Sequence, residues 1–182
     1  MKFIVTSHLS FLPNDPISTQ FDLGNIQDLK IALMKIINAI IDNNSWAQEE
    51  AAEILKIDQP KVSRIKHLKT SGFSLERILL FLLRLNCHID LSVTLPDDIA
   101  IIDVQSDIKD TKLEVMYLIV SIIAKCNLSQ KKAASLMRVD QPKVSNITRL
   151  KTDHITLEFL LNLLTRMDCQ IEFIVKGSTL EE

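Results

Sequence analysis

Glycine and proline are scarce in this chain. Its 182 residues include 3 Gly and 5 Pro, so few positions are suited to tight turns or to breaking a helix. Gly and Pro are also the two residues that most disfavour a helix interior. Their scarcity predicts long regular elements that are mostly helical.

Long apolar runs and paired cysteines are missing as well. No unbroken apolar stretch is long enough to span a membrane, and Met1–Val5 is too short for the core of a signal peptide. The 3 Cys form neither a CxxC pair nor an even framework. Cys87 and Cys169 follow apolar helical patterns at matched positions, so we interpret them as buried structural thiols. These features indicate a cytoplasmic protein.

Signals of catalysis are absent from the sequence. There is no nucleophile–base pairing, no Gly-rich phosphate loop and no metal-binding cluster. The four histidines show no metal-ligand spacing, and only His67 is placed where it can touch a phosphate. The others, His8, His88 and His154, are interpreted as surface or strand residues. We therefore expect no enzyme activity, no cofactor and no metal.

What the chain does have is a hexapeptide that occurs twice. Asp58-Gln-Pro-Lys-Val-Ser63 returns letter for letter as Asp140-Gln-Pro-Lys-Val-Ser145, 82 positions later. Asp58 suits a helix N-cap, because its carboxylate accepts from free backbone N–H groups and its charge suits the helix dipole. Pro60 follows in the first turn, where its missing N–H costs nothing. The hexapeptide thus predicts the start of a helix in each copy.

The repeat extends well beyond the hexapeptide. Residues 24–93 align with 106–175 without a gap, and about four positions in ten are identical. We divide the chain into an N-terminal arm (1–23, with a short strand at Lys2–Val5), a first unit (24–95), a linker (96–105, with a turn at 96–98), a second unit (106–176) and a tail (177–182).

Within each unit the apolar spacing is helical. A first helix begins after Asn25 or Asp107 and ends at Asn43-Asn44 in the first unit; a second covers 48–55; a third covers about 59–68. Ser74 and Thr156 cap a further apolar helix. Residues 88–93 and 170–175 alternate apolar and polar, which predicts a closing strand.

The packing demands of a helix-turn-helix are met in both units. A small residue is needed where the two helices cross, and Ala52 and Ala134 supply it. The apolar anchors stand at fixed offsets after it: Leu55, Ile57, Val62 and Ile65 in the first unit, and Met137, Val139, Val144 and Ile147 in the second. The alternative is a helical bundle in which the hexapeptide only caps a structural helix and has no role in binding.

The run from Gln48-x-x-Ala51-Ala52 through the hexapeptide, then Phe73-Ser-Leu-Glu-Arg77 and a closing strand, resembles the Cro/phage-repressor (XRE-like) helix-turn-helix regulators. The closest group is the HigA-type antitoxins. The resemblance implies a mainly α fold: two tandem helix-turn-helix domains of about five helices, each ending in a short β-strand, whose strands can pair across a pseudo-two-fold. One departure is the turn, where Gly is usual and Lys56 and Arg138 stand instead, at a cost of about 1 kcal/mol for a left-handed conformation. Another is Ala47, which stands where Ser or Thr is the usual cap.

The resemblance also implies where DNA is bound. The start of the second helix would contact the DNA backbone and the start of the recognition helix would read bases. The residues that the resemblance places there are Gln48, Gln59, Lys61, Ser63 and Arg64 in the first unit, and Gln130, Gln141, Lys143, Ser145 and Asn146 in the second. Lys66, Lys131, Thr148 and Arg149 lie on or just after the same helices and complete the candidate set.

Charge is unevenly distributed over this frame. The net charge is -2, so the whole chain is not a basic nucleic-acid binder. Lysines and arginines nevertheless gather on both recognition helices. Lys131 and Lys132 in the second unit are replaced by Glu49 and Glu50 in the first, so the second unit should bind phosphate more strongly.

Two functions remain open at this point. The first is a sequence-specific transcription regulator, by preference a repressor, that binds double-stranded DNA as a covalent pseudo-dimer; it would be nucleoid-associated. The alternative is an antitoxin that binds a toxin protein and autoregulates its operon. Further homodimerisation stays open in either case.

Overall fold

The computed structural model describes residues 17–21, 26–95, 98–104 and 107–177. Two units of four helices follow one another along the chain, with strands before and after each. The order is β1 (Ile17–Phe21), α1 (Ile26–Asn43), α2 (Gln48–Leu55), α3 (Gln59–Lys66), α4 (Leu75–Arg84), β2 (His88–Leu95), β3 (Asp98–Asp103), α5 (Ile108–Lys125), α6 (Gln130–Met137), α7 (Gln141–Thr148), α8 (Leu157–Arg166) and β4 (Gln170–Lys176).

The strands form one antiparallel sheet in the order β1-β4-β2-β3. The closing strands β2 and β4 pair with each other at its centre, as the sequence predicts. Each outer strand pairs with the closing strand of the other unit: β1 lies beside β4, and β3 lies beside β2. The two units therefore exchange their leading strands, and neither unit has a complete sheet of its own.

A pseudo-two-fold axis passes through the middle of the sheet. Leu91 lies directly opposite Phe173, and these two residues occupy equivalent positions in the two repeats. Both side chains are fully buried. Because side chains alternate between the faces of a strand, this pairing also fixes which residues of β2 and β4 face the helices.

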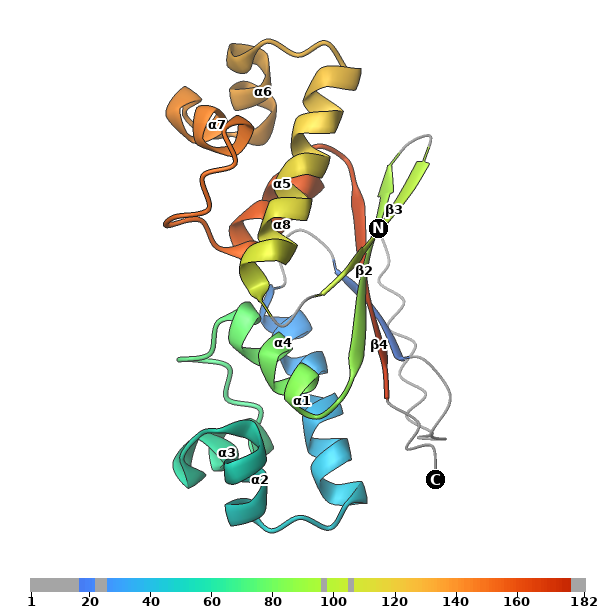
Figure 1. Ribbon diagram of the computed structural model, residues 1–182, viewed down its shortest axis with the longest axis vertical. Helices are drawn as coiled ribbons and strands as arrows, with labels where there is room; N and C mark the ends of the chain where they lie inside the picture. Colours follow the sequence, from blue (N-terminus) through green and yellow to red (C-terminus); the bar gives the residue numbers. More distant parts are fainter. Residues whose placement is uncertain (1–16, 22–25, 96–97, 105–106, 178–182) are drawn as a thin grey trace.

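The helices all lie on one side of the sheet, and the molecule is elongated (Figure 1). The α2–α3 pair lies at one end and the α6–α7 pair at the other, on the side of the molecule away from the sheet. Apolar residues from both units form a single continuous core between helices and sheet. Cys87 and Cys169 belong to this core, as predicted, whereas Cys126 is exposed.

The helices of the two units also meet directly, between α4 and α8 and near their N-termini. The Leu157 backbone N–H donates to Glu76 Oε1 at 2.8 Å, so a side chain of the first unit caps a helix of the second. In the reverse direction, Lys30 of α1 pairs with Glu158 of α8 at 3.1 Å, and its side chain is only 9% exposed. These contacts add to the sheet in fixing one unit against the other.

Several predictions about elements need correction. Among the described residues each unit has four helices rather than about five, and the recognition helix of the first unit ends at Lys66 rather than near residue 68. The expected linker contains β3, and the expected arm contains β1. The first helix does end at Asn43, but the left-handed residue that follows is Ser45, with φ 54°. The strand expected at Lys2–Val5 and the cap at Asn25 lie outside the described residues.

Most other caps follow the sequence; the exceptions are Ala47 and Asp140, which make no side-chain cap hydrogen bond. Ser74 and Thr156 accept from backbone N–H groups at the starts of α4 and α8, and Asp107 does so at the start of α5. Among the described residues, no single helix has the length and apolar character needed to cross a membrane; only α5 and α6 taken together meet those criteria, with a bend of 119° between them.

The exchanged strands predict that an isolated unit dimerises. A fragment of residues 1–95 keeps β1 and β2 but lacks the strands with which they pair, and unpaired strand edges seek partners. Two copies can rebuild the sheet, with β2 against β2 and β1 against the other copy's β2. We expect a dimer by sedimentation, and we expect Leu91→Asp, which places a charge at the axis, to disrupt it. A well-folded monomer at high concentration would contradict this pairing.

Candidate nucleic-acid interface

The turn between α2 and α3 is built the same way in both units. Lys56 ends α2 in the left-handed conformation with φ 52°, and Arg138 does so after α6 with φ 54°. The next residue closes the turn: Ile57 N donates to Ala52 O at 3.0 Å, and Val139 N donates to Ala134 O at 2.9 Å. This arrangement satisfies carbonyls at the helix end that would otherwise lack partners. The departure from Gly that the sequence shows is thus accommodated by a non-Gly residue in the left-handed region.

Apolar packing sets the angle between the two helices of each pair. The predicted small residues lie at the crossing and are buried, as are most of the predicted anchors; only Ile57 and Val139 are half-buried. The fully or almost fully buried set is Ala51, Ala52, Leu55, Val62 and Ile65 in the first unit, and Ala133, Ala134, Met137, Val144 and Ile147 in the second. The recognition helix is therefore held by its apolar side, and its polar side faces outwards.

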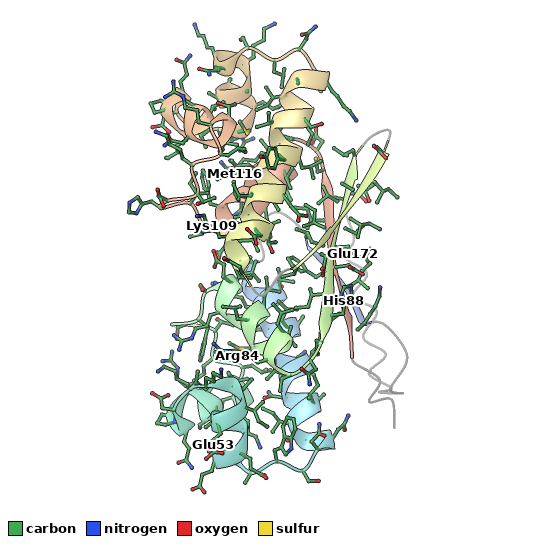
Figure 2. The ribbon with its side chains drawn as sticks, in the orientation of Figure 1. Glu53, Arg84, His88, Lys109, Met116 and Glu172 are labelled. Carbon is green, nitrogen blue, oxygen red and sulfur yellow. The ribbon has the colours of Figure 1, made fainter. Side chains whose placement is uncertain are left out.

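An arginine from the following helix supports this frame in each unit. Arg84 of α4 donates to the Leu55 carbonyl at the end of α2 (Figure 2), and Arg166 of α8 donates to the Met137 carbonyl at 2.7 Å. The two arginines and the two carbonyls are equivalent in the repeats. These positioning residues were not predicted from the sequence. The available signal was an arginine at the matched last position of two largely apolar helices.

Asn38 gives the first unit a support that the second lacks. Its Nδ2 on α1 donates to the Ile65 carbonyl at 3.1 Å and to the Lys66 carbonyl at 3.4 Å, which caps the end of α3. The equivalent residue in the second unit is Val120, which has no polar group to offer. Recognition helix α3 is thus tied to α1 by hydrogen bonds as well as by packing.

This repeated arrangement agrees with the comparison to known families. The model of a family described as "Helix-turn-helix domain" matches residues 21–94 and again residues 101–176. The chain belongs to this helix-turn-helix domain family. Both units are therefore helix-turn-helix domains in tandem, a fold typical of DNA-binding regulators. No curated protein and no solved structure matches the chain.

The predicted DNA-binding residues lie at the solvent side of the helix-turn-helix pairs. Gln59 and Gln141 begin α3 and α7, and Gln48 and Gln130 begin α2 and α6. Exposed members of the predicted set are Gln48, Gln59, Gln130, Lys131, Gln141, Lys143, Asn146 and Arg149; half-buried members are Lys61, Ser63, Arg64, Lys66, Ser145 and Thr148. The structure brings each unit's set together around one helix pair.

Acidic side chains hold some of the predicted cations. Asp58 accepts from the Lys61 backbone N–H at 3.2 Å and pairs with Lys61 Nζ at 2.9 Å. The hydrogen bond from the Lys61 side chain is the main cause that lowers the pKa of Asp58. In the second unit Lys143 Nζ pairs with Asp140 at 3.4 Å, but the Asp140 side chain makes no cap hydrogen bond to the backbone of α7. These lysines are therefore held at the leading ends of the recognition helices.

Arg64 contacts the loop that follows its own helix. Its guanidinium donates to the Ser71 carbonyl and to Ser71 Oγ, the latter at 3.0 Å, and lies 5.6 Å from the centre of the Phe73 ring. A Cβ added to Gly72, whose φ is +82°, would approach this guanidinium within 3.3 Å. Arg64 thus supports the loop between α3 and α4. The second unit has Asn146, Asp153 and His154 at the equivalent positions.

The missing cap at Ala47 has a partial substitute. The Ala47 backbone N–H donates to Glu50 Oε2 at 3.1 Å, which is half of a capping box. In the second unit Ser129 caps α6 in the expected way, accepting from Lys132 N at 3.3 Å. The first unit's α2 therefore lacks only the side-chain half of the reciprocal pair.

The left-handed turn residues predict a stabilising substitution. Lys56→Gly and Arg138→Gly should each stabilise the protein, by up to about 1 kcal/mol, because Gly removes the steric cost of the left-handed conformation, part of which the greater freedom of the unfolded chain offsets. Chemical denaturation measures the change. Glu53→Gly, on the exposed side of α2 (Figure 2), is the control and should destabilise by about 1 kcal/mol. If both turn variants lose stability, the turn carries no such strain.

Proposed function

We propose that the chain regulates transcription, as a repressor, by binding a bipartite site on double-stranded DNA as a covalent pseudo-dimer. The observation that carries this proposal is the pair of recognition helices related by the pseudo-two-fold of the shared sheet. Both helices begin with the same Gln-Pro-Lys sequence, and its Gln and Pro are exposed in both copies. Regulators of this type read two half-sites about one helical turn apart, or multiples of that distance. Here one chain supplies both readers, and such a regulator would act in the cytoplasm, on the nucleoid.

Roles follow from the position of each residue on its helix pair. Gln59, Lys61 and Ser63, with their equivalents Gln141, Lys143 and Ser145, would contact bases or nearby phosphates in the major groove. Gln48, Gln130 and Lys131 would contact the DNA backbone, because the first helix of such a pair crosses it. Arg64, Lys66, Asn146, Thr148 and Arg149 complete the proposed contact set and differ between the units. Selected sites should therefore be imperfect palindromes.

An antitoxin function is the second candidate. It is favoured by Ile99 and Ile101 on the edge strand β3, whose exposed fractions are 61% and 67%. An exposed apolar edge strand is a typical site for adding a strand from a protein partner. A toxin would be such a partner, and DNA binding would then serve autoregulation.

Base reading and backbone contact can be separated by substitution. Gln59→Ala and Gln141→Ala should each cost about 1–3 kcal/mol on a selected site and much less on random duplex, because each removes a base contact. Site selection from random duplex DNA supplies the target, and gel-shift titrations measure affinity. A perfectly symmetric consensus would count against different contacts in the two halves.

Loss of a phosphate contact should instead change how DNA affinity depends on salt concentration. Lys131→Ala should weaken binding to selected and random DNA alike and reduce the salt slope by about one unit. The chain offers a matched control, since Glu49 occupies the equivalent position; Glu49→Lys should raise the slope by about one unit. If these variants and both Gln variants bind like the parent, the hexapeptide is only a structural cap and the toxin-binding function takes precedence.

Substitution of Arg64 should affect DNA binding in a third way. Because its guanidinium holds the Ser71–Phe73 loop, Arg64→Ala should loosen that loop and weaken binding about equally at every base pair of the selected site. Asn146→Ala in the second unit, with no such loop contact in the structure, is the comparison. Loss of preference at a single base pair in the Arg64 variant would instead assign Arg64 to base reading.

A further inference from the structure

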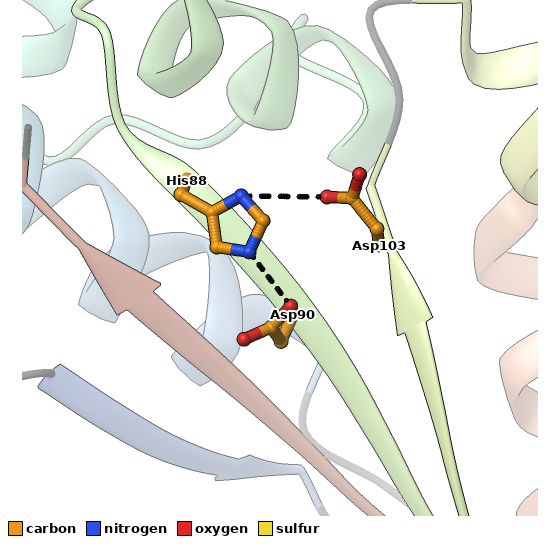
Figure 3. Close-up of side chains that lie close together, drawn as sticks. All are labelled: His88, Asp90 and Asp103. Carbon is orange, nitrogen blue, oxygen red and sulfur yellow. Dashed lines mark hydrogen bonds and ion pairs between the residues drawn. The ribbon is translucent and has the colours of Figure 1, made fainter.

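A second group of polar side chains lies on the sheet, away from the recognition helices. His88 and Asp90 belong to β2, and Asp103 belongs to β3 (Figure 3). The His88 ring lies between the two carboxylates: its Nε2 is 2.9 Å from Asp90 Oδ1 and its Nδ1 is 3.5 Å from Asp103 Oδ1. The three residues come from both sides of the boundary between the two units.

Strand geometry explains why the three side chains converge. His88 and Asp90 are two positions apart on one strand and therefore share a face, while the buried Ile89 between them faces the core. Asp103 lies directly opposite Asp90 on the neighbouring strand, where side chains on one face approach closely. One ring nitrogen and one oxygen from each carboxylate all lie within 4.8 Å of one another.

Asp90 is the anchor of the group. Its side chain is 13% exposed, and its Oδ2 accepts from Lys176 of β4 at 2.8 Å, which leaves Oδ1 facing the imidazole. The ion pair with Lys176 thus orients the Asp90 carboxylate.

We propose that His88, Asp90 and Asp103 form a binding site for a divalent transition-metal ion such as Zn²⁺. His88 and Asp90 lie two positions apart on β2, and Asp103 lies opposite Asp90 on β3. The three side chains would therefore bind the ion from one side. Zinc binds imidazole nitrogen and carboxylate oxygen at about 2.0–2.2 Å, which brings neighbouring ligand atoms to about 3.3 Å. The His88 and Asp103 side chains are 52% and 50% exposed, so they can move the distance of up to about 1.5 Å that separates the present spread of 4.8 Å from this geometry.

The donor types select the kind of ion. An imidazole nitrogen among the ligands favours Zn²⁺ and its transition-metal neighbours over Mg²⁺ and Ca²⁺, which take oxygen ligands. Cys87 precedes His88, but its side chain is only 6% exposed and belongs to the hydrophobic core. It therefore lies away from the exposed His88 ring and adds no ligand. The fourth position would face solvent and hold water.

The duplication provides an internal comparison. The positions equivalent to His88 and Asp90 are Gln170 and Glu172, and the position equivalent to Lys176 is Thr94. The imidazole is thus missing from the matching place on β4, and we expect one ion per chain. The sequence did not indicate this site because Asp103 belongs to a segment expected to be a linker.

A bound ion would join the two units. Two ligands lie on the closing strand of the first unit, and Asp103 lies on the strand that leads into the second. An ion held by both strands would oppose their separation, and any ligand that binds only the folded state raises its stability. Metal binding should therefore raise the unfolding temperature.

The experiment is a titration of the full chain with Zn²⁺ alone, by calorimetry, without DNA. The expected result is one equivalent bound, with affinity lowered at least about tenfold by His88→Ala and by Asp103→Asn; that is the loss seen even when a residue behind the ligands is removed. Asp98→Asn is the matched control, the same change on the same strand beside Lys125, and should leave affinity unchanged. Cys126→Ser checks that the exposed thiol is not the ligand.

Each outcome bears on the site itself. Circular dichroism of every variant without metal verifies that the sheet is intact, and a rise in unfolding temperature with Zn²⁺ should vanish in His88→Ala. Absence of binding by the parent chain, or equal binding by His88→Ala, would show that the group is only an ion-paired cluster holding β3 to β2. Because no DNA is present, failure here leaves the proposed regulatory function untouched.

Discussion

The pairing of β2 with β4 is the interaction on which the rest of the structure depends. With Leu91 opposite Phe173 at the axis, it joins the closing strands of both units and leaves an edge on each side. Those edges are filled by the leading strands of the opposite units. A one-residue slip would turn the buried face of β2 towards solvent, so the register is strongly fixed. The positions of the two recognition helices follow from it, because α1–α4 and α5–α8 pack on the same side of this sheet.

Side-chain contacts near the axis also hold the two units together, but equivalent residues of the two units make different contacts. Glu76 caps α8, whereas its equivalent Glu158 pairs with Lys30 of α1. The equivalent of Lys30, Lys112, donates to the Ile155 carbonyl within its own unit. Perfect symmetry would require both sides to use the same bonds. The two units are thus related by their backbone and core, and distinguished by the polar contacts between them.

The sequence predicted what is local and repeated. The bounds of α2, the cap at Ser74 and the left-handed Lys56 all follow from short-range rules of capping and turn chemistry, and the buried anchors follow from helical spacing. Strands β1 and β3 were not predicted, because their pairing partners lie in the other unit and no local pattern shows an exchange of strands. The same reason hid the contact between His88 and Asp103: two segments meet only through the register of the sheet. The capping of α3 by Asn38 was hidden too, since it joins residues 27 apart.

Fusion of the two units explains why such differences can exist. In a homodimer any substitution appears in both halves, so a change that suits one half-site or one side of the interface is imposed on the other. In this chain Arg64 supports a loop while Asn146 does not, and Asn38 caps α3 while Val120 cannot cap α7. Core positions tolerate only substitutions of similar size, as with Leu55 and Met137, whereas exposed polar positions are free to diverge. The shared core therefore keeps the spacing of the readers constant while each half changes its own surface.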